Sequence, residues 1–539
     1  MASTIEEIEE TISNAIAPGF KERLLERGLA RSMIWVNGVL PEGAPNFSDT
    51  LGYNLLAYGY SLLSLSIRLK ELGGDESISR LGFEKAASAI ANVIHNGDPD
   101  NNEKGFHKVL SASAYHLGRY SAKAYSLIRN NLDNENLSQI ERVLSLLILR
   151  RFDEVGSIVI DWQRQGIASD EALADSITDS LSSVFEELKS GSSNFENHGF
   201  DSIELSVLDA ALTDNYYSAI SEYLFALETG NNQILEGALE RIEMCLDICS
   251  EFSLIPQWWV FRVTRHLLSD SWSTSFHQVI PFTPDHEHAE EWELLRKLFI
   301  STLFKRAKSE VDLWPSQIEG ASRAINDDDS LVVSLPTSAG KTRVAELCIL
   351  RCLSIGKRVL FITPLRALSA QTEASLRKTF LPLGKTVSSL YGSMGTNAFE
   401  QDVLKTHDIV VGTPEKLDFA LRNDSSIIDD VGLVILDEGH MIGLNEREIN
   451  YEVQIQRLLK RPDADDRRIV CLSAILPSGD QFDDFVAWLR RDGNGEAIQS
   501  SWRPTDLRFG EIIWRNNSGR IDFTVGEEQP FIPNYLSPM

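Results

Sequence analysis

Two patterns of apolar residues divide the chain, and one replaces the other near residue 280. Before that point, apolar residues recur at three- and four-residue intervals, the spacing of amphipathic helices. The segments with this spacing are 51–72, 107–128, 136–150, 170–188 and 232–250. Polar stretches rich in Asn, Gly and Ser separate them at 95–105 and 190–199. We therefore predict an all-helical N-terminal region.

Beyond residue 280 the pattern changes to short apolar runs rich in β-branched residues. Pro281 and Pro284 stop helices at the transition. The predicted strands are 331–335, 358–363, 386–391, 408–412, 433–437 and 468–473. Each run is almost continuously apolar, as a strand buried on both faces must be, and helical segments lie between most of them. The alternation predicts a mostly parallel, doubly wound sheet, so the fold class is α followed by α/β.

The charge is unevenly distributed. The 539 residues include 79 acidic and 51 basic side chains, for a net charge of −28. Residues 1–300 carry −22 of this and residues 301–539 only −6. An acidic balance argues against broad non-specific attraction to nucleic acid. The helical region is therefore better suited to solubility or to contacts with a protein partner.

Composition excludes several classes of protein. Hydrophobic residues make up 43 % and charged residues 24 %, which are globular values and exclude disordered and collagen-like chains. No apolar run approaches the roughly 18 residues of a spanning helix, and the first residues do not have the pattern of a signal peptide. The five cysteines are few and odd in number, which favours free thiols in a reducing compartment. We expect a cytoplasmic protein without a membrane segment.

A phosphate-binding loop follows the first predicted strand. The run PTSAGKT at 336–342 fits the pattern G-x-x-x-x-G-K-[ST], except that Leu335 replaces the first glycine. Gly340 lets the backbone approach a phosphate, Lys341 adds a cation for the β- and γ-phosphates, and Thr342 offers a hydroxyl to Mg²⁺. The candidate ATP-binding residues here are Thr337, Ser338, Ala339, Gly340, Lys341 and Thr342.

A pair of carboxylates closes another predicted strand. Asp437 and Glu438 end the run LVILD and begin the tetrapeptide DEGH. The carboxyl end of a parallel strand is where ligands bind in such sheets. Asp437 is placed to hold Mg²⁺, and Glu438 to orient and deprotonate the attacking water. Lys341, Asp437, Glu438 and His440 are the candidate catalytic residues, with Thr342 and Asp437 as the candidate metal ligands.

Six motifs in order resemble the first RecA-like domain of superfamily 2 helicases, in the DExH branch. They are LWPSQ at 313–317, PTSAGKT at 336–342, TPLRALSAQ at 363–371, GTPEKLD at 412–418, DEGH at 437–440 and SAI at 473–475. The resemblance covers roughly residues 305–515. It implies that ATP and Mg²⁺ are the cofactors and that Gln317 reads the adenine edge.

The resemblance also implies a track for nucleic acid. Pro364 and Arg366 follow one strand, and Thr413 and Pro414 follow another. Contacts from such residues go to phosphates and carry no base sequence, so we expect backbone tracking on DNA or RNA. Ser473 and Ala474 are implied to couple the nucleotide to this track.

The predicted domains are a helical region at 1–280, a linker and leading helix at 281–304, the RecA-like domain at 305–500 and a crossover segment at 501–539. The family's motor needs a second RecA-like domain that supplies arginines, and the sequence shows no such segment. We therefore expect a fragment of a longer protein or half of a split motor. The leading hypothesis is an ATP-dependent helicase. The alternative is a nucleotide-binding scaffold with little turnover, and a metabolic P-loop kinase is a weak third.

Overall fold

The computed structural model forms two compact units, residues 1–270 with 504–539 and residues 271–503. The first division falls after residue 270, whereas the sequence places the end of the helical region at 280. The structure describes residues 4–34, 47–94, 104–129, 131–132, 137–164, 200–280, 288–326, 330–337, 339–390, 405–439, 441, 446–474, 480–491, 497–500, 502–503, 509–515, 518–524 and 534–536.

The first unit is helical over its described residues up to 270. Its helices are α1 (Ile5–Ile16), α2 (Phe20–Ile34), α3 (Leu51–Glu71), α4 (Glu76–Ile94), α5 (Lys104–Leu117), α6 (Ser121–Ile128), α7 (Gln139–Ile148), α9 (Phe200–Thr229), α10 (Asn232–Glu251) and α11 (Ile255–Ser273), with residues 152–164 also helical. The prediction of helices is confirmed, and the predicted helix at 170–188 lies outside the described residues. Among the described helices, none combines the length and apolar character needed to cross a membrane.

Local sequence accounts for these helices. In α3, Leu55, Leu63 and Ile67 share one face and are fully buried, as their spacing requires. The start of α7 carries a capping box, in which the Ser138 hydroxyl accepts from the Glu141 amide and the Glu141 carboxylate accepts from the Ser138 amide. Apolar faces and caps therefore set where these helices form and where they begin.

The C-terminal part of the chain adds a small separate sheet. Strands β8 (Phe509–Arg515), β9 (Ser518–Thr524) and β10 (Asn534–Leu536) are antiparallel in the order β10-β9-β8. The sequence indicated only a crossover segment here.

The second unit is an α/β domain. Its strands are β1 (Leu331–Ser334), β2 (Arg358–Ile362), β3 (Val387–Ser389), β4 (Ile409–Gly412), β5 (Val431–Leu436), β6 (Arg468–Ser473) and β7 (Ile498–Gln499). Its helices are α12 (Phe276–Val279), α13 (Ala289–Phe304), α14 (Pro315–Ala324), α15 (Lys341–Ser354), α16 (Arg366–Phe380), α18 (Pro414–Asn423), α19 (Glu446–Leu459) and α20 (Asp480–Leu489), with 3-10 turns η1 (Leu381–Leu383), η2 (Ser425–Ile428) and η3 (Ala464–Asp466). All six predicted strands are confirmed, and β7 adds a short edge strand.

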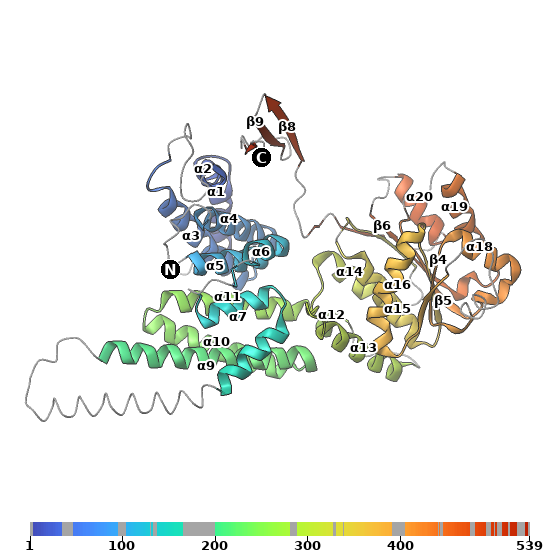
Figure 1. Cartoon of the computed structure of the whole chain (residues 1–539), viewed down its shortest axis with the longest axis horizontal. Coiled ribbons are helices and arrows are strands. Elements are labelled where there is room, and N and C mark those ends of the chain that lie inside the picture. The colour runs from blue at the N-terminus through green and yellow to red at the C-terminus, as the bar shows by residue number, and fades with distance from the viewer. Residues whose placement is uncertain are drawn as a thin grey trace, which may run out of the picture. The chain divides into compact units, whose positions relative to one another are not determined.

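The seven strands form one parallel sheet in the order β3-β4-β2-β5-β6-β1-β7. Helices cover both faces (Figure 1): α14, α15 and α16 lie on one side, and α18, α19 and α20 on the other. Successive residues of β1 enter opposite cores, since Val333 packs with the first set and Val332 with the second. This explains why the strands are apolar without alternation.

The strand order fixes which motifs meet. All carboxyl ends of a parallel sheet lie at one edge. The loop after β1 and the carboxylates after β5 flank the end of β6, which lies between them. The segments after β2 and β4 occupy the neighbouring part of the same edge. The five motifs that follow strands therefore line one edge of the domain, and LWPSQ lies at the start of α14.

Candidate nucleotide and nucleic-acid site

The loop between β1 and α15 is a turn closed by its own backbone. The Ala339 amide donates to the Pro336 carbonyl at 3.0 Å, and the Arg343 amide to the Gly340 carbonyl at 3.0 Å. Gly340 precedes the first residue of α15 at φ 86° and ψ 31°, a left-handed conformation that favours glycine. Lys341 and Thr342 are thus the first residues of a helix whose free amides face the loop. Thr342 is exposed, and Ser338 lies outside the described residues.

The departure from the loop pattern at Leu335 has a packing explanation. Leu335 is fully buried in the core that α15 shares with the sheet. Its amide donates to the Ser473 carbonyl at 3.1 Å, which extends the pairing of β1 with β6. The residue therefore continues the strand and leaves the phosphate-facing part of the loop to Gly340 and the residues around it.

Gln317 supports the loop from α14. Its Nε2 donates to the Gly340 carbonyl at 3.1 Å, and its Oε1 accepts from the Trp314 amide at 2.8 Å. Ser316 adds a second support, since its hydroxyl donates to the Ala339 carbonyl at 2.9 Å. The adenine contact of Gln317 stays a prediction. Its side-chain amide has a second hydrogen and a second oxygen lone pair with which to form that contact.

Asp437 is held at the end of β5 by backbone bonds. Its amide donates to the Ile362 carbonyl at 2.9 Å, and its own carbonyl accepts from the hydroxyl of the buried Tyr451 at 3.1 Å. Burial and then the adjacent Glu438 charge raise the pKa of Asp437 to about 6, against smaller lowering effects of the Glu438 amide and of Lys341. The Lys341 charge thus acts on Asp437, although 96 positions separate the two residues in the sequence.

The turn after Asp437 is conformationally strained. Glu438 has φ 52°, which a residue other than glycine rarely adopts. Its carbonyl accepts from the Met441 amide at 2.8 Å, and the next amide, of Gly439, donates to the Leu472 carbonyl at 2.9 Å. A Cβ at Gly439 would lie 2.3 Å from the Cys471 sulfur, so only glycine fits. Such strain is found at functional sites, where packing holds it in place. His440 lies outside the described residues.

The donor set fits a divalent cation and a nucleoside triphosphate. The adjacent Glu438 charge disfavours the ionised form of the half-buried Asp437, and a divalent cation removes that penalty. Carboxylate, hydroxyl and phosphate oxygens are ligands that Mg²⁺ prefers. Asp437 and Thr342 are the residues that would hold the ion, while the loop amides and Lys341 would hold the phosphates.

Ser473 and Ala474 end β6, between the two halves of this site. Ser473 is fully buried, and its carbonyl bonds to the loop strand as described above. Leu472, one residue earlier, bonds to the turn after Asp437. The end of β6 therefore connects the phosphate loop to the carboxylate turn, and the coupling role of Ser473 and Ala474 stays a prediction.

The candidate nucleic-acid residues differ in exposure. Arg366 is exposed at the first residue of α16, next to the half-exposed Leu365. Pro364, Thr413 and Pro414 are buried, with Thr413 only 3 % exposed. The turn before α16 is held by the Thr363 amide, which donates to the Gly412 carbonyl at 2.9 Å and so joins the two predicted segments. Arg366 is therefore the accessible charge of this set, and the other three shape the edge beneath it.

Two further residues support the site and were not predicted from the sequence. Ser316 lies within LWPSQ, so its position beside Gln317 was a usable signal. Tyr451 comes from α19, and nothing local marks it as a partner of the Asp437 carbonyl.

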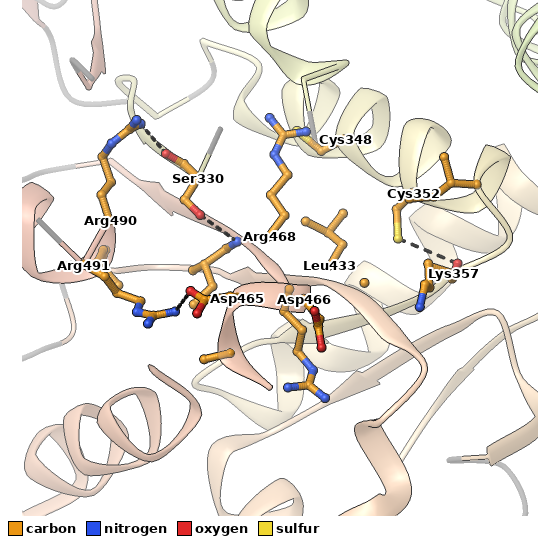
Figure 2. Close-up of a pocket in the computed structure, with 16 residues that line it drawn as sticks. Ser330, Cys348, Cys352, Lys357, Leu433, Asp465, Asp466, Arg468, Arg490 and Arg491 are labelled. Carbon is orange, nitrogen blue, oxygen red and sulfur yellow. Dashed lines mark hydrogen bonds and ion pairs between the residues drawn. The ribbon is translucent and has the colours of Figure 1, made fainter. Parts of the chain in front are cut away.

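A separate cavity of about 470 Å³ lies at the opposite edge of the sheet, around the amino ends of β1, β5 and β6. Figure 2 shows several of its arginines, which come from β6 and the end of α20. Their hydrogen bonds go to the protein itself: Arg490 donates to the Ser330 carbonyl, Arg468 to two carbonyls of α14, and Arg491 pairs with Asp465. These arginines tie the base of the sheet together.

Comparisons with known proteins agree with this geometry. Residues 314–482 match the DEAD/DEAH box helicase family. The chain is 24 % identical to the Hachiman protein HamB of Bacillus cereus over 96 % of its own length and 42 % of that protein. It is 32 % identical to the ATP-dependent DNA helicase Hel308 of Pyrococcus abyssi over 37 % of the chain and 26 % of the helicase. It is 30 % identical to Hel308 of Thermococcus kodakarensis over 39 % of the chain and 18 % of that helicase.

The chain spans less than half the length of each of these relatives. The Hel308 matches cover a segment about as long as the α/β unit, whereas the HamB match also includes the helical region. With the loop, the carboxylate turn and the parallel sheet in place, residues 314–482 form a superfamily 2 helicase domain of the DEAD/DEAH box type.

Proposed function

We propose that this chain supplies the ATP-binding half of a DNA helicase or translocase. The observation that carries the proposal is the meeting of the loop at Gly340–Thr342 with the carboxylates Asp437 and Glu438 at one sheet edge. Asp437 and Thr342 would hold Mg²⁺ there, and the ion would supply positive charge against the charge that develops in phosphoryl transfer. Lys341 binds the phosphates, and Glu438 positions and deprotonates the attacking water.

DNA is the substrate that the relatives favour. Hel308 is named as an ATP-dependent DNA helicase, and its similarity covers 37–39 % of the chain, about the length of the α/β unit that carries the site. Arg366 offers the accessible phosphate contact on the neighbouring part of the edge. Such a contact positions a strand without reading its sequence. We therefore propose a motor that tracks the backbone of single-stranded DNA.

The helical unit is proposed to bind a protein partner. Its acidic composition is suited to contacts with a basic protein. The similarity to HamB covers 96 % of the chain and therefore includes this unit.

The alternative function is a nucleotide-dependent scaffold that binds ATP and hydrolyses little of it. In this family, arginines of a second RecA-like domain stabilise the charge of the transition state. Their contribution in related NTPases is about 10³–10⁵ in rate. The ATP hydrolysis rate therefore separates the two functions.

The test is the ATPase rate of the full chain with and without a 20-mer of single-stranded DNA or of RNA. Glu438→Gln removes the base and is expected to lower the rate by about 10²–10⁴. Glu452→Gln makes the same chemical change on exposed α19 and is the matched control. The motor is supported if DNA stimulates ATP hydrolysis and only Glu438→Gln loses it. The scaffold is supported if the wild type and both variants bind ATP but none hydrolyses it.

ATP binding is tested separately. Lys341→Ala removes a charge-assisted contact worth about 1.5–3 kcal/mol, so affinity for a fluorescent ATP analogue is expected to fall about 10- to 150-fold. Unchanged affinity would contradict the assignment of the loop.

A further inference from the structure

The acidic helical unit contains a stretch without acidic residues. Residues 104–132 carry Lys104, Lys108, Arg119, Lys123 and Arg129, and no Asp or Glu. The rest of residues 1–300 holds all 45 acidic side chains and only 18 basic ones. This stretch forms α5 and α6, which pack beside α4 and α7 (Figure 1). Most of this unit would repel a polyanion, whereas the basic side chains of residues 104–132 would attract it.

Basic and aromatic side chains gather at the turn between α5 and α6. The Arg80 guanidinium lies 4.9 Å from the centre of the Tyr120 ring, and the Lys123 ammonium 4.8 Å from the same ring. Arg80 Nε also donates to the Gly118 carbonyl at 3.1 Å, which holds α4 against this turn. One carboxylate, Glu84, lies 3.0 Å from Lys123.

Two arginines occupy positions where a glycine would be favoured. Arg119 lies two residues after the end of α5 with φ 65°, and Arg150 lies two residues after the end of α7 with φ 59°. Both turns have the hydrogen bonds of a Schellman motif: the Arg119 amide donates to His116 and the next amide to Tyr115, and Arg150 and Arg151 repeat the pattern on Leu147 and Leu146. An L-residue is strained in this conformation, so glycine is tolerated at both positions.

The two strained arginines act on one imidazole. Burial and then the charges of Arg150 and Arg119 lower the pKa of His116 to about 3. The helices that precede these arginines, α5 and α7, pack against each other. Within the described residues, the buried Nδ1 of His116 has no hydrogen-bond partner. The turns after α5 and α7 therefore add their arginines to the part of the helical unit where these two helices pack together.

We propose that the surface formed by Arg80, Arg119, Lys123 and Arg150, named here the basic turn, binds the phosphate backbone of single-stranded nucleic acid. The inference rests on the proposed function, because a chain that acts on nucleic acid has a use for a second phosphate contact. Guanidinium forks match phosphate oxygens, and rings beside cations are usual where single strands bind. An acidic protein segment is the competing occupant.

The test uses arginine-to-glycine substitutions. R119G/R150G removes two charges while giving each turn the residue that its backbone favours, so the protein is expected to stay folded. The control R241Q/R265Q removes two charges from α10 and α11 of the same unit, where both arginines form surface ion pairs. R119K/R150K keeps the charge. Circular dichroism and thermal unfolding check each fold.

Binding of fluorescein-labelled dT20 to the full chain is measured by anisotropy between 50 and 200 mM salt. Losing two phosphate contacts lowers the slope of log affinity against log salt by about 1.4. We expect R119G/R150G to show that change and about tenfold weaker binding at 100 mM salt, with the control within twofold and R119K/R150K near the wild type. Unchanged affinity and slope in R119G/R150G would overturn the basic turn as a binding surface.

Two further arms separate this inference from the proposed function. If dT20 stimulates ATP hydrolysis and Arg366→Ala weakens its binding while R119G/R150G does not, the basic turn is refuted and the motor stands. If the wild type binds no dT20, the basic turn is refuted, and the ATP-binding measurements judge the nucleotide site independently. The last arm adds poly-L-glutamate at a charge equal to that of dT20. If it displaces dT20 from the wild type but not from R119G/R150G, the surface is assigned to an acidic protein.

Discussion

Replacing Gly340 by alanine tests the support of the phosphate loop by Gln317. The new Cβ would lie 1.9 Å from the Gln317 nitrogen and 2.8 Å from its Cδ, so one side chain must move. The backbone at φ 86° adds about 1–2 kcal/mol for an L-residue. Losing the Gln317 bond to the Gly340 carbonyl adds about 1 kcal/mol.

The sum is about 2–3 kcal/mol against the binding conformation of the loop, which corresponds to about 30- to 150-fold weaker ATP binding. Titration with a fluorescent ATP analogue measures it. Gly356→Ala is the matched control, because that glycine has φ 72° at the end of α15 and nothing within 4 Å of its Cβ position. It is expected to lower stability by about 1 kcal/mol and leave ATP affinity unchanged.

A double-mutant cycle isolates the steric clash between the new methyl group at position 340 and the Gln317 side chain. Gln317→Ala removes the side chain that the new methyl group meets, so Gln317→Ala/Gly340→Ala is expected to bind ATP more tightly than Gly340→Ala alone. A coupling energy near zero, or wild-type affinity in Gly340→Ala, would refute the claim that Gln317 positions this loop.

Three further predictions concern residues around the site and in the helical unit. Arg343→Gln leaves the buried Glu346 carboxylate without its ion pair and is expected to lower the free energy of unfolding by about 3 kcal/mol in a denaturant titration, a loss that Arg343→Lys should partly restore. Tyr451→Phe removes the bond to the Asp437 carbonyl and should cost about 1 kcal/mol of stability with ATP affinity within twofold; a large affinity change would contradict an anchoring role. The hydrogen bond from His266 leads the effects that lower the pKa of Glu71 to about 2. The ionised form of Glu71 therefore stabilises the fold above about pH 4.5, and this stabilisation is lost as the pH falls toward 2. The stability difference between the wild type and Glu71→Gln should shrink over that range, and a difference that stays constant would exclude the linkage.

The amino-acid sequence determined the elements and the chemistry of each motif. Continuous apolar runs predict strands buried on both faces, and all six predicted strands are present. The phosphate loop, the DEGH tetrapeptide and the segment around Arg366 are contiguous runs whose chemistry depends on neighbouring residues. They are readable from the sequence for that reason. The edge strand β7 was missed because two residues give no periodic signal.

Contacts between distant segments were decided only by the tertiary structure. The strand order places the end of β6 between the loop and the carboxylates, and helical packing brings Tyr451 to Asp437 and Gln317 to Gly340. The net acidic charge of the helical region predicted repulsion of phosphates, yet the packing of α4 against α5 brings Arg80 and Lys123 to the Tyr120 ring. Local periodicity encodes which face of an element is buried. It does not encode which element it is buried against, because that choice depends on the packing of the whole chain.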